Sequence, residues 1–144
     1  MIQYFRGDFV WLSNFYPSYV EVGPITAHTI ENAYQACKAK HTNDFTAIIT
    51  AVAPGEAKRL GKQCAMVENW DRIKVIIMRD LLRQKFKRHS MLADMLVDTD
   101  PQELIEGNNW HDNFWGDCIC NDCEDVFGRN MLGKLLMDIR RELL

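Results

Sequence analysis

The pattern of hydrophobic and polar residues changes once along the chain, near residue 29. Before that point apolar and polar residues alternate, and the alternation predicts strands at 2–5, 9–15 and 19–22, separated by turns that contain glycine or proline. After that point apolar residues recur every three or four positions, which predicts helices. The predicted helices cover 29–41, 43–53, 54–64, 70–87, 91–97 and 129–143, and two stretches, 103–106 and 114–120, are predicted to be extended.

Helices therefore outweigh the strands, and no repeat or linker interrupts the chain. We predict the α+β class, with one compact, mainly helical single domain over 1–144 and a small β-sheet. With 144 residues, 47% of them hydrophobic and 26% charged, the chain is long enough for a core and typical of globular proteins. No apolar run approaches the roughly 18 residues that cross a bilayer, and the N-terminus does not read as a signal peptide. We therefore expect a cytoplasmic protein that does not bind a membrane.

The predicted helix at 29–41 carries two stripes of side chains. At about 100° per residue its apolar residues form one stripe, and Glu31, Gln35 and Lys38 form a second, narrow and polar one. This polar stripe is either a solvated face or the lining of a pocket that offers a carboxylate, an amide and an amine. The pattern alone favours the solvated face, because glutamate and lysine usually lie in water.

The cysteines pose a separate question about metal binding. The chain has five of them, an odd number without an export signal, so free thiols are expected. Cys118, Cys120 and Cys123 form a C-x-C-x2-C cluster that, together with His111, could supply zinc ligands. Against zinc, the chain has no second paired-ligand segment, and several carboxylates crowd this loop. We therefore predict incidental thiols in a polar loop and no metal site.

Three further segments combine polar or aromatic residues with turns or glycine. Asn14 lies in an aromatic-rich turn, which turn chemistry explains by itself. Trp115, beside Gly116, either caps the core or provides a stacking platform for a base. Gly133 lies inside the last predicted helix, where glycine costs about 1 kcal/mol relative to alanine. It therefore indicates either close helix packing or room for a ligand beside Asn130.

Charge and missing motifs exclude several functional classes. The net charge of −3 argues against broad electrostatic binding of nucleic acid. The sequence also lacks a glycine-rich phosphate loop, a dinucleotide-binding fingerprint, a nucleophile elbow and a zinc-protease helix. Enzymes that depend on these motifs are therefore excluded.

Several short segments, taken together with their order and spacing, are characteristic of one protein family. They are 12–17, 31–39, 57–61, Trp70 with Arg72 and Met78, Lys85-Phe86, Glu106, Trp115-Gly116 and 130–137. In this combination the chain resembles the YbiA-like, or NADAR, family over nearly its whole length. The resemblance implies a small α+β domain that cleaves N-glycosidic bonds. It also implies a link to phosphoribosylamino intermediates of riboflavin synthesis or to removal of ADP-ribose from guanine.

The resemblance changes the interpretation of the polar stripe, because Glu31 and Lys38 match positions where the family has its active site. Cleavage of an N-ribosyl bond builds positive charge on the anomeric carbon and negative charge on the leaving nitrogen. Glu31 would stabilise the first charge or protonate the second, and Lys38 would attack the ring-opened sugar to form a Schiff base. That attack needs a neutral amine, which burial or a nearby cation such as Lys40 or Lys58 would favour.

The same interpretation assigns substrate-binding roles. Gln35 would hold a sugar hydroxyl, Trp115 would stack on the leaving base, and Asn130 with nearby backbone amides would bind a phosphate. The full predicted binding set is Asn14, Phe15, Tyr34, Gln35, Trp115, Gly116 and Asn130.

We therefore expect an N-glycosidase that needs no cofactor and acts on a phosphoribosylamino-pyrimidine of the riboflavin-intermediate type. One alternative is an ADP-ribosyl-guanine hydrolase, for which nucleic acid is bound only as a modified substrate. The other alternative is a non-catalytic module that binds NAD or ADP-ribose. The acidic net charge slightly favours a small-molecule substrate, and the sequence indicates no oligomeric state.

Overall fold

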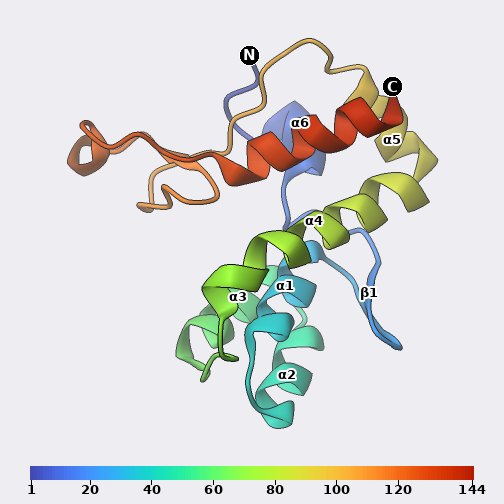
Figure 1. The fold of residues 1–144 in the computed structure, drawn as a ribbon, viewed down its shortest axis with the longest axis vertical. Helices are drawn as coiled ribbons and strands as arrows, with labels where there is room; N and C mark the ends of the chain where they lie inside the picture. The colour runs from blue at the N-terminus through green and yellow to red at the C-terminus, as the bar shows by residue number, and fades with distance from the viewer. The chain divides into compact units, whose positions relative to one another are not determined.

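The computed structural model describes residues 1–144, which form two units of contacting residues. One unit comprises 14–88, and the other comprises 1–13 together with 89–144. Helices dominate both units (Figure 1). The β-structure is limited to two sheets of two short strands each. The predicted mainly helical α+β fold with a small amount of β-structure is therefore confirmed.

The unit 14–88 is built around one central helix, α1. Its elements are β1 (Val20–Val22), β2 (Ile25–Ala27), α1 (Ile30–Lys38), α2 (Thr42–Ile49), α3 (Pro54–Gln63) and α4 (Trp70–Arg88). Strands β1 and β2 form an antiparallel hairpin, and α1 contacts α2, α3 and α4. Because α1 is covered by three helices, even its polar residues in the first two turns are buried.

Asn32 connects the start of α1 to the end of α2. Thr29 caps α1 by accepting a hydrogen bond from the Asn32 backbone N–H at 3.0 Å, and the Thr29 hydroxyl donates to Asn32 Oδ1 at 2.6 Å. The Asn32 side-chain amide donates to the carbonyls of Ile48 and Ala51 at 3.1 and 3.0 Å. The Ile48 carbonyl, in the last turn of α2, also accepts from the Ala51 N–H at 3.2 Å. One buried side chain therefore ties the end of α2 and the segment that follows it to the start of α1.

The second unit is organised around the last helix. Its elements are η1 (Gly7–Leu12), α5 (Ser90–Val97), β3 (Gly107–Asn108), β4 (Asp117–Cys118), η2 (Asn121–Cys123) and α6 (Met131–Leu143). Helix α6 packs against α5. The buried Arg140 of α6 donates to Thr99 Oγ1 at 2.9 Å and to the Gln102 carbonyl at 2.8 Å. These bonds fix the loop that follows α5.

The predicted strand at 9–15 is wrong, because residues Gly7–Leu12 form the 3-10 helix η1. Trp11 and Leu12 are neighbours and are both buried, whereas a strand that has one face in water buries only alternate residues. The Trp11 indole also donates to the Asp8 carbonyl at 3.0 Å, a local bond that the tight helical turn permits.

Other predicted extended segments are shorter in the structure. The stretches 2–5 and 103–106 reduce to one isolated bridge between Ile2 and Leu104. The stretch 114–120 contains only β4, which pairs in parallel with β3. Strand β1 lies within the predicted 19–22, while its partner β2 lies outside the predicted strands.

The predicted helices agree better, since each of the long ones is present with ends shifted by a few residues. Helix α4 follows its predicted range closely, and Pro54 begins α3 as predicted. None of the helices combines the length and the apolar character that crossing a membrane requires.

Candidate functional site

Glu31 and Gln35 form the centre of the candidate site, in the first two turns of α1. Both residues are only 7% exposed, and Gln35 Nε2 donates to Glu31 Oε1 at 2.9 Å. The residues are one helical turn apart and therefore share a face. The Glu31 backbone N–H donates to the Asn14 carbonyl at 3.1 Å, which ties the segment before β1 to this turn. For this pair the structure excludes a solvated face.

The surroundings of Glu31 suit a carboxylate that meets positive charge. It lies in the first turn of α1, where the helix dipole favours an anion. Its bond to Gln35 fixes the orientation of the carboxylate. Because the site is shielded from water, an interaction with a developing cation would be stronger there than at the surface. The arrangement can therefore stabilise a cationic centre or transfer a proton.

Two predicted binding residues have a buried oxygen that receives no hydrogen bond. These atoms are Asn14 Oδ1 and Gln35 Oε1. A buried acceptor without a donor costs about 1–3 kcal/mol, so a ligand hydroxyl or amide that donates to it gains a favourable bond. Gly61 of α3 provides the space for the Gln35 side chain, because a Cβ at position 61 would collide with Gln35 Oε1.

The two predicted aromatic residues of this unit have different environments. Phe15 is 41% exposed, and Lys58 Nζ lies 6.0 Å from its ring centroid. Tyr34 is buried, and its ring centroid lies 5.2 Å from that of Trp70 with the planes tilted by 52°. Phe15 is accessible for stacking on a ligand, whereas Tyr34 packs in the core, so its stacking role stays a prediction.

Lys38 lies apart from the Glu31–Gln35 pair. It is the last residue of α1, it is partly exposed, and its amine takes no part in the hydrogen bond between Gln35 and Glu31. Seven residues of helix separate the α-carbons of Glu31 and Lys38 by about 10 Å along the axis. Two long side chains can reach a common ligand across that distance, so the catalytic role of Lys38 stays a prediction.

Lys85 is a buried cation that the sequence analysis did not assign to the site. The residue is fully buried, and its Nζ lies 5.5 Å from the ring centroid of Tyr16 and 5.3 Å from that of Phe86. Tyr16 belongs to the same segment as Asn14. The signal in the sequence is spacing: Lys85 follows the buried Met78 by seven residues, which places both on one face of α4.

Asn130 belongs to the other unit and braces two chain segments there. It begins α6 in the left-handed conformation, with a φ of 49°. Its Nδ2 donates to the Leu104 carbonyl at 2.9 Å, and its Oδ1 accepts from the Glu106 N–H at 2.9 Å. Gly133 reflects close packing, because a Cβ there would collide with the Leu104 carbonyl. The phosphate-binding role of Asn130 stays a prediction.

Trp115 and Gly116 also lie in this second unit, in the loop before α6. Asp112 Oδ1 accepts hydrogen bonds from the backbone of Phe114 at 3.1 Å and of Trp115 at 2.9 Å. The rings of Phe114 and Trp115 meet edge to face, with centroids 4.9 Å apart. A Cβ on Gly116 would collide with the Glu106 carbonyl, so the glycine is required by close packing. The Trp115 ring is half-buried and stays a candidate for stacking.

Comparison with known proteins decides the family. The model of the NADAR domain matches residues 4–144. The chain belongs to the NADAR family. This NADAR protein is 36% identical over 137 residues to an N-glycosidase of Nostoc punctiforme, covering 91% of the chain and 83% of that protein. It is 34% identical over 139 residues to N-glycosidase YbiA of Escherichia coli, covering 95% of the chain and 81% of YbiA.

Two further comparisons extend the relationship. A riboflavin biosynthesis protein of Vibrio vulnificus is 34% identical over 135 residues, which make up 92% of the NADAR chain but only 35% of that longer protein. The NMR structure of Escherichia coli YbiA matches with a TM-score of 0.81 at 32% identity, covering 95% of this chain and 79% of YbiA. The family resemblance and the YbiA-like fold are therefore confirmed.

Proposed function

We propose that this protein hydrolyses the N-glycosidic bond of a phosphoribosylamino-pyrimidine, a substrate of the type that occurs in riboflavin synthesis. The coarser statement rests on the family: like the relatives named N-glycosidases, the chain is a hydrolase that acts on N-glycosyl bonds. The substrate class is supported by matches to riboflavin biosynthesis proteins of Vibrio vulnificus and Zea mays. The net charge of −3 favours a small metabolite over a polyanion.

The observation that carries the proposal is the buried Glu31–Gln35 pair. As the bond between sugar and base breaks, positive charge grows on the anomeric carbon, and a buried carboxylate beside that carbon lowers the barrier. Gln35 holds the Glu31 carboxylate in place through its Nε2 and offers its Oε1 to a sugar hydroxyl. Asn14 Oδ1 offers a second acceptor, and the exposed Phe15 ring offers a surface for the base.

Lys38 adds a covalent route to the same products. When the ribose ring opens, its anomeric carbon becomes an imine carbon that is bonded to the nitrogen of the base. The neutral Lys38 amine adds to this carbon, the base leaves with its nitrogen as an amine, and a lysine Schiff base is left. Water then adds to the Schiff base, which releases the sugar aldehyde and restores the lysine.

The test follows product release from 5-amino-6-(5-phosphoribosylamino)uracil by mass spectrometry. The unaltered protein is expected to release diaminouracil and ribose 5-phosphate. Glu31→Gln keeps the shape of the side chain but removes its charge, so turnover should fall by about 10²–10⁴-fold. The control, Glu56→Gln, changes an exposed glutamate of α3 and should keep full turnover.

Borohydride trapping separates the two routes. Reduction during turnover should attach the sugar phosphate to the unaltered protein and to the control Lys62→Ala, but not to Lys38→Ala. Turnover without an adduct would leave Glu31 as the catalyst and remove Lys38 from the mechanism. No product from this substrate, with cleavage of an ADP-ribosylated guanine oligonucleotide instead, would refute the proposed substrate class.

A further inference from the structure

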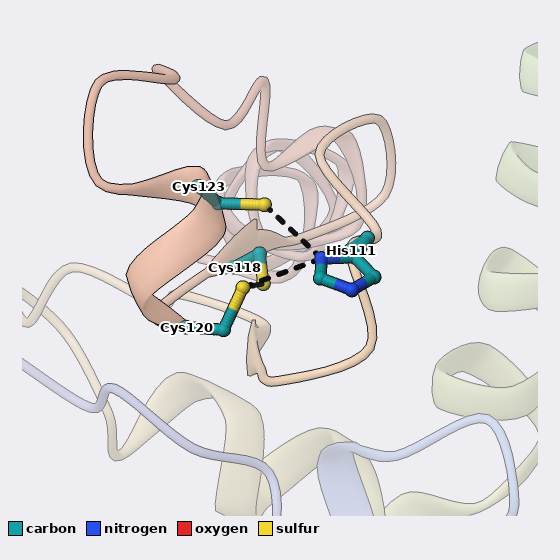
Figure 2. A group of neighbouring side chains, drawn as sticks. All are labelled: His111, Cys118, Cys120 and Cys123. Carbon is teal, nitrogen blue, oxygen red and sulfur yellow. Dashed lines mark hydrogen bonds between the residues drawn. The ribbon is translucent and has the colours of Figure 1, made fainter.

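Four side chains of the second unit converge in the loop before α6. They are His111, Cys118 of β4, Cys120, and Cys123 of η2 (Figure 2). Their ligand atoms all lie within 4.8 Å of one another. His111 Nδ1 lies 3.3 Å from Cys120 Sγ and 3.4 Å from Cys123 Sγ, and the sulfurs of Cys118 and Cys120 are 3.3 Å apart.

These separations are close to those of a tetrahedral zinc site. Zinc bonds of about 2.3 Å to sulfur and about 2.0 Å to nitrogen require S···S separations of about 3.8 Å and S···N separations of about 3.6 Å. The contacts of 3.3–3.4 Å are a few tenths of an ångström shorter than these values, and no pair of ligand atoms is more than 4.8 Å apart, so small side-chain movements would complete the tetrahedron. We propose that His111, Cys118, Cys120 and Cys123 bind one zinc ion.

The donor set selects the ion and the type of site. Thiolates with one imidazole in a tetrahedral arrangement are typical of zinc, whereas magnesium and calcium prefer oxygen ligands. Three sulfurs and one nitrogen fill all four positions, so no position is open for water or substrate. The zinc is therefore structural, and the proposal is independent of the proposed N-glycosidase activity.

A buried asparagine positions the histidine that the zinc site needs. Asn108 Oδ1 accepts from the N–H groups of Trp110 at 3.2 Å and Asp112 at 3.1 Å, and its Nδ2 donates to the Asp112 carbonyl at 2.7 Å. This tight turn contains His111, whose φ of 68° is unusual for a residue other than glycine. The turn directs Nδ1 towards the thiols. His111 therefore supplies the fourth ligand, and the site needs no second segment with paired ligands.

A second asparagine connects two of the cysteines. Asn113 Nδ2 donates to Cys123 Sγ at 3.4 Å, and Asn113 Oδ1 accepts from the Cys118 N–H at 3.0 Å. A donor that points at a sulfur stabilises the thiolate that zinc binds, and such outer-shell bonds orient the ligands of metal sites. The nearby carboxylates do not belong to the cluster; that of Asp117 accepts from the Gly128 N–H instead.

The segment that carries the ligands has little regular secondary structure. Between β3 and α6 it contains only the two residues of β4 and the short η2, and several of its apolar side chains are exposed, among them Ile119 at 51% and Phe127 at 96%. Long segments without regular structure are uncommon in compact proteins unless something fixes them. A zinc ion bound at four points would fix this one, and with it the Trp115–Gly116 stretch that lies between the ligands.

The first test measures zinc in the unaltered protein, purified without chelators and with reduced thiols. Elemental mass spectrometry should find about one zinc per chain, and cobalt substitution should give the charge-transfer absorption of thiolate ligands. The paired variants are Cys120→Ser, which removes a half-exposed ligand, and Cys64→Ser, which changes a cysteine outside the cluster. Zinc affinity should fall at least tenfold in Cys120→Ser and stay unchanged in Cys64→Ser.

Several results would overturn the proposal. Zinc well below one per chain, with no uptake when zinc is added to the reduced protein, would do so even if the variants fail to fold. Equal zinc affinity in Cys120→Ser and Cys64→Ser would place the metal elsewhere. A reduced protein that takes up no zinc, together with an oxidised form whose peptide map shows a bond between Cys118 and Cys120, would identify these two as a disulfide pair instead.

Discussion

Replacing Gly61 by alanine tests whether the Gln35 side chain is held where the site needs it. Gly61 lies inside α3, and a Cβ there would collide with the end of the Gln35 side chain. The Gln35 amide must therefore move away, which breaks its bond to Glu31. The matched substitution is Gly55→Ala in the same helix, where a Cβ would meet nothing within 4 Å.

The size of the effect follows from two opposing contributions. Alanine in a helix is about 1 kcal/mol more favourable than glycine, and this gain applies to both substitutions. At position 61 the loss of a hydrogen bond to a charged group costs about 1.5–3 kcal/mol. Gly61→Ala should therefore destabilise the protein by about 0.5–2 kcal/mol, whereas Gly55→Ala should be neutral or stabilising.

Urea unfolding and turnover measure the two consequences separately. With a slope of about 2 kcal/mol per M, the urea midpoint of Gly61→Ala should fall by about 0.25–1 M. Its kcat should fall by about tenfold, because a misplaced Glu31 loses at least 1.4 kcal/mol of transition-state stabilisation. If Gly61→Ala were as stable and as active as Gly55→Ala, the argument that Gly61 positions Gln35 and Glu31 would be refuted.

Two further predictions concern the same unit. Asn32→Ala removes the side-chain donor to the carbonyls of Ile48 and Ala51, and only the Ile48 carbonyl keeps the Ala51 N–H, so urea unfolding should show a loss of about 1–3 kcal/mol. The exposed Asn43→Ala should change stability by less than about 0.5 kcal/mol, and equal losses in both would contradict the bridging role of Asn32. Burial, with a smaller contribution from the charge of Asp80, raises the pKa of Cys37 to about 11, so its alkylation should be slow near neutral pH and accelerate until the pH reaches about 11. Peptide mass mapping after alkylation of the folded protein measures this rate. Fast alkylation of Cys37 at neutral pH would show that the thiol is not shielded.

Helices and their ends could be predicted from the sequence because their signals are local. Thr29 caps α1, Pro54 begins α3, and the apolar period of α4 runs over the whole of that helix. The strands could not be predicted as well, because they are two or three residues long and their alternation is too short to distinguish from a turn. Residues Gly7–Leu12 are an example of this ambiguity. Their apolar residues fit a strand pattern, yet they form a 3-10 helix in which the adjacent Trp11 and Leu12 are both buried.

The part of the candidate site that lies on one helix could be selected from the sequence. The period of α1 together with the family resemblance indicates Glu31 and Gln35, and the structure buries both, while their roles stay predictions. Lys85 was not predictable from residue type, since lysine is rarely buried and only its spacing on α4 indicates the core. The sequence offered His111 and the three cysteines as possible ligands, but it did not show that they converge, because a turn with positive φ at His111 brings them together.

The burial of charged side chains changes how the protein looks to a partner in solution. The charged residues in the interior are Glu31, Lys85 and Arg140, one acid and two bases. The solvent-exposed ionisable groups therefore sum to −4, while the distant field still follows the formal net charge of −3. For an anionic substrate such as the proposed sugar phosphate, this acidic balance predicts capture that becomes faster as salt concentration rises.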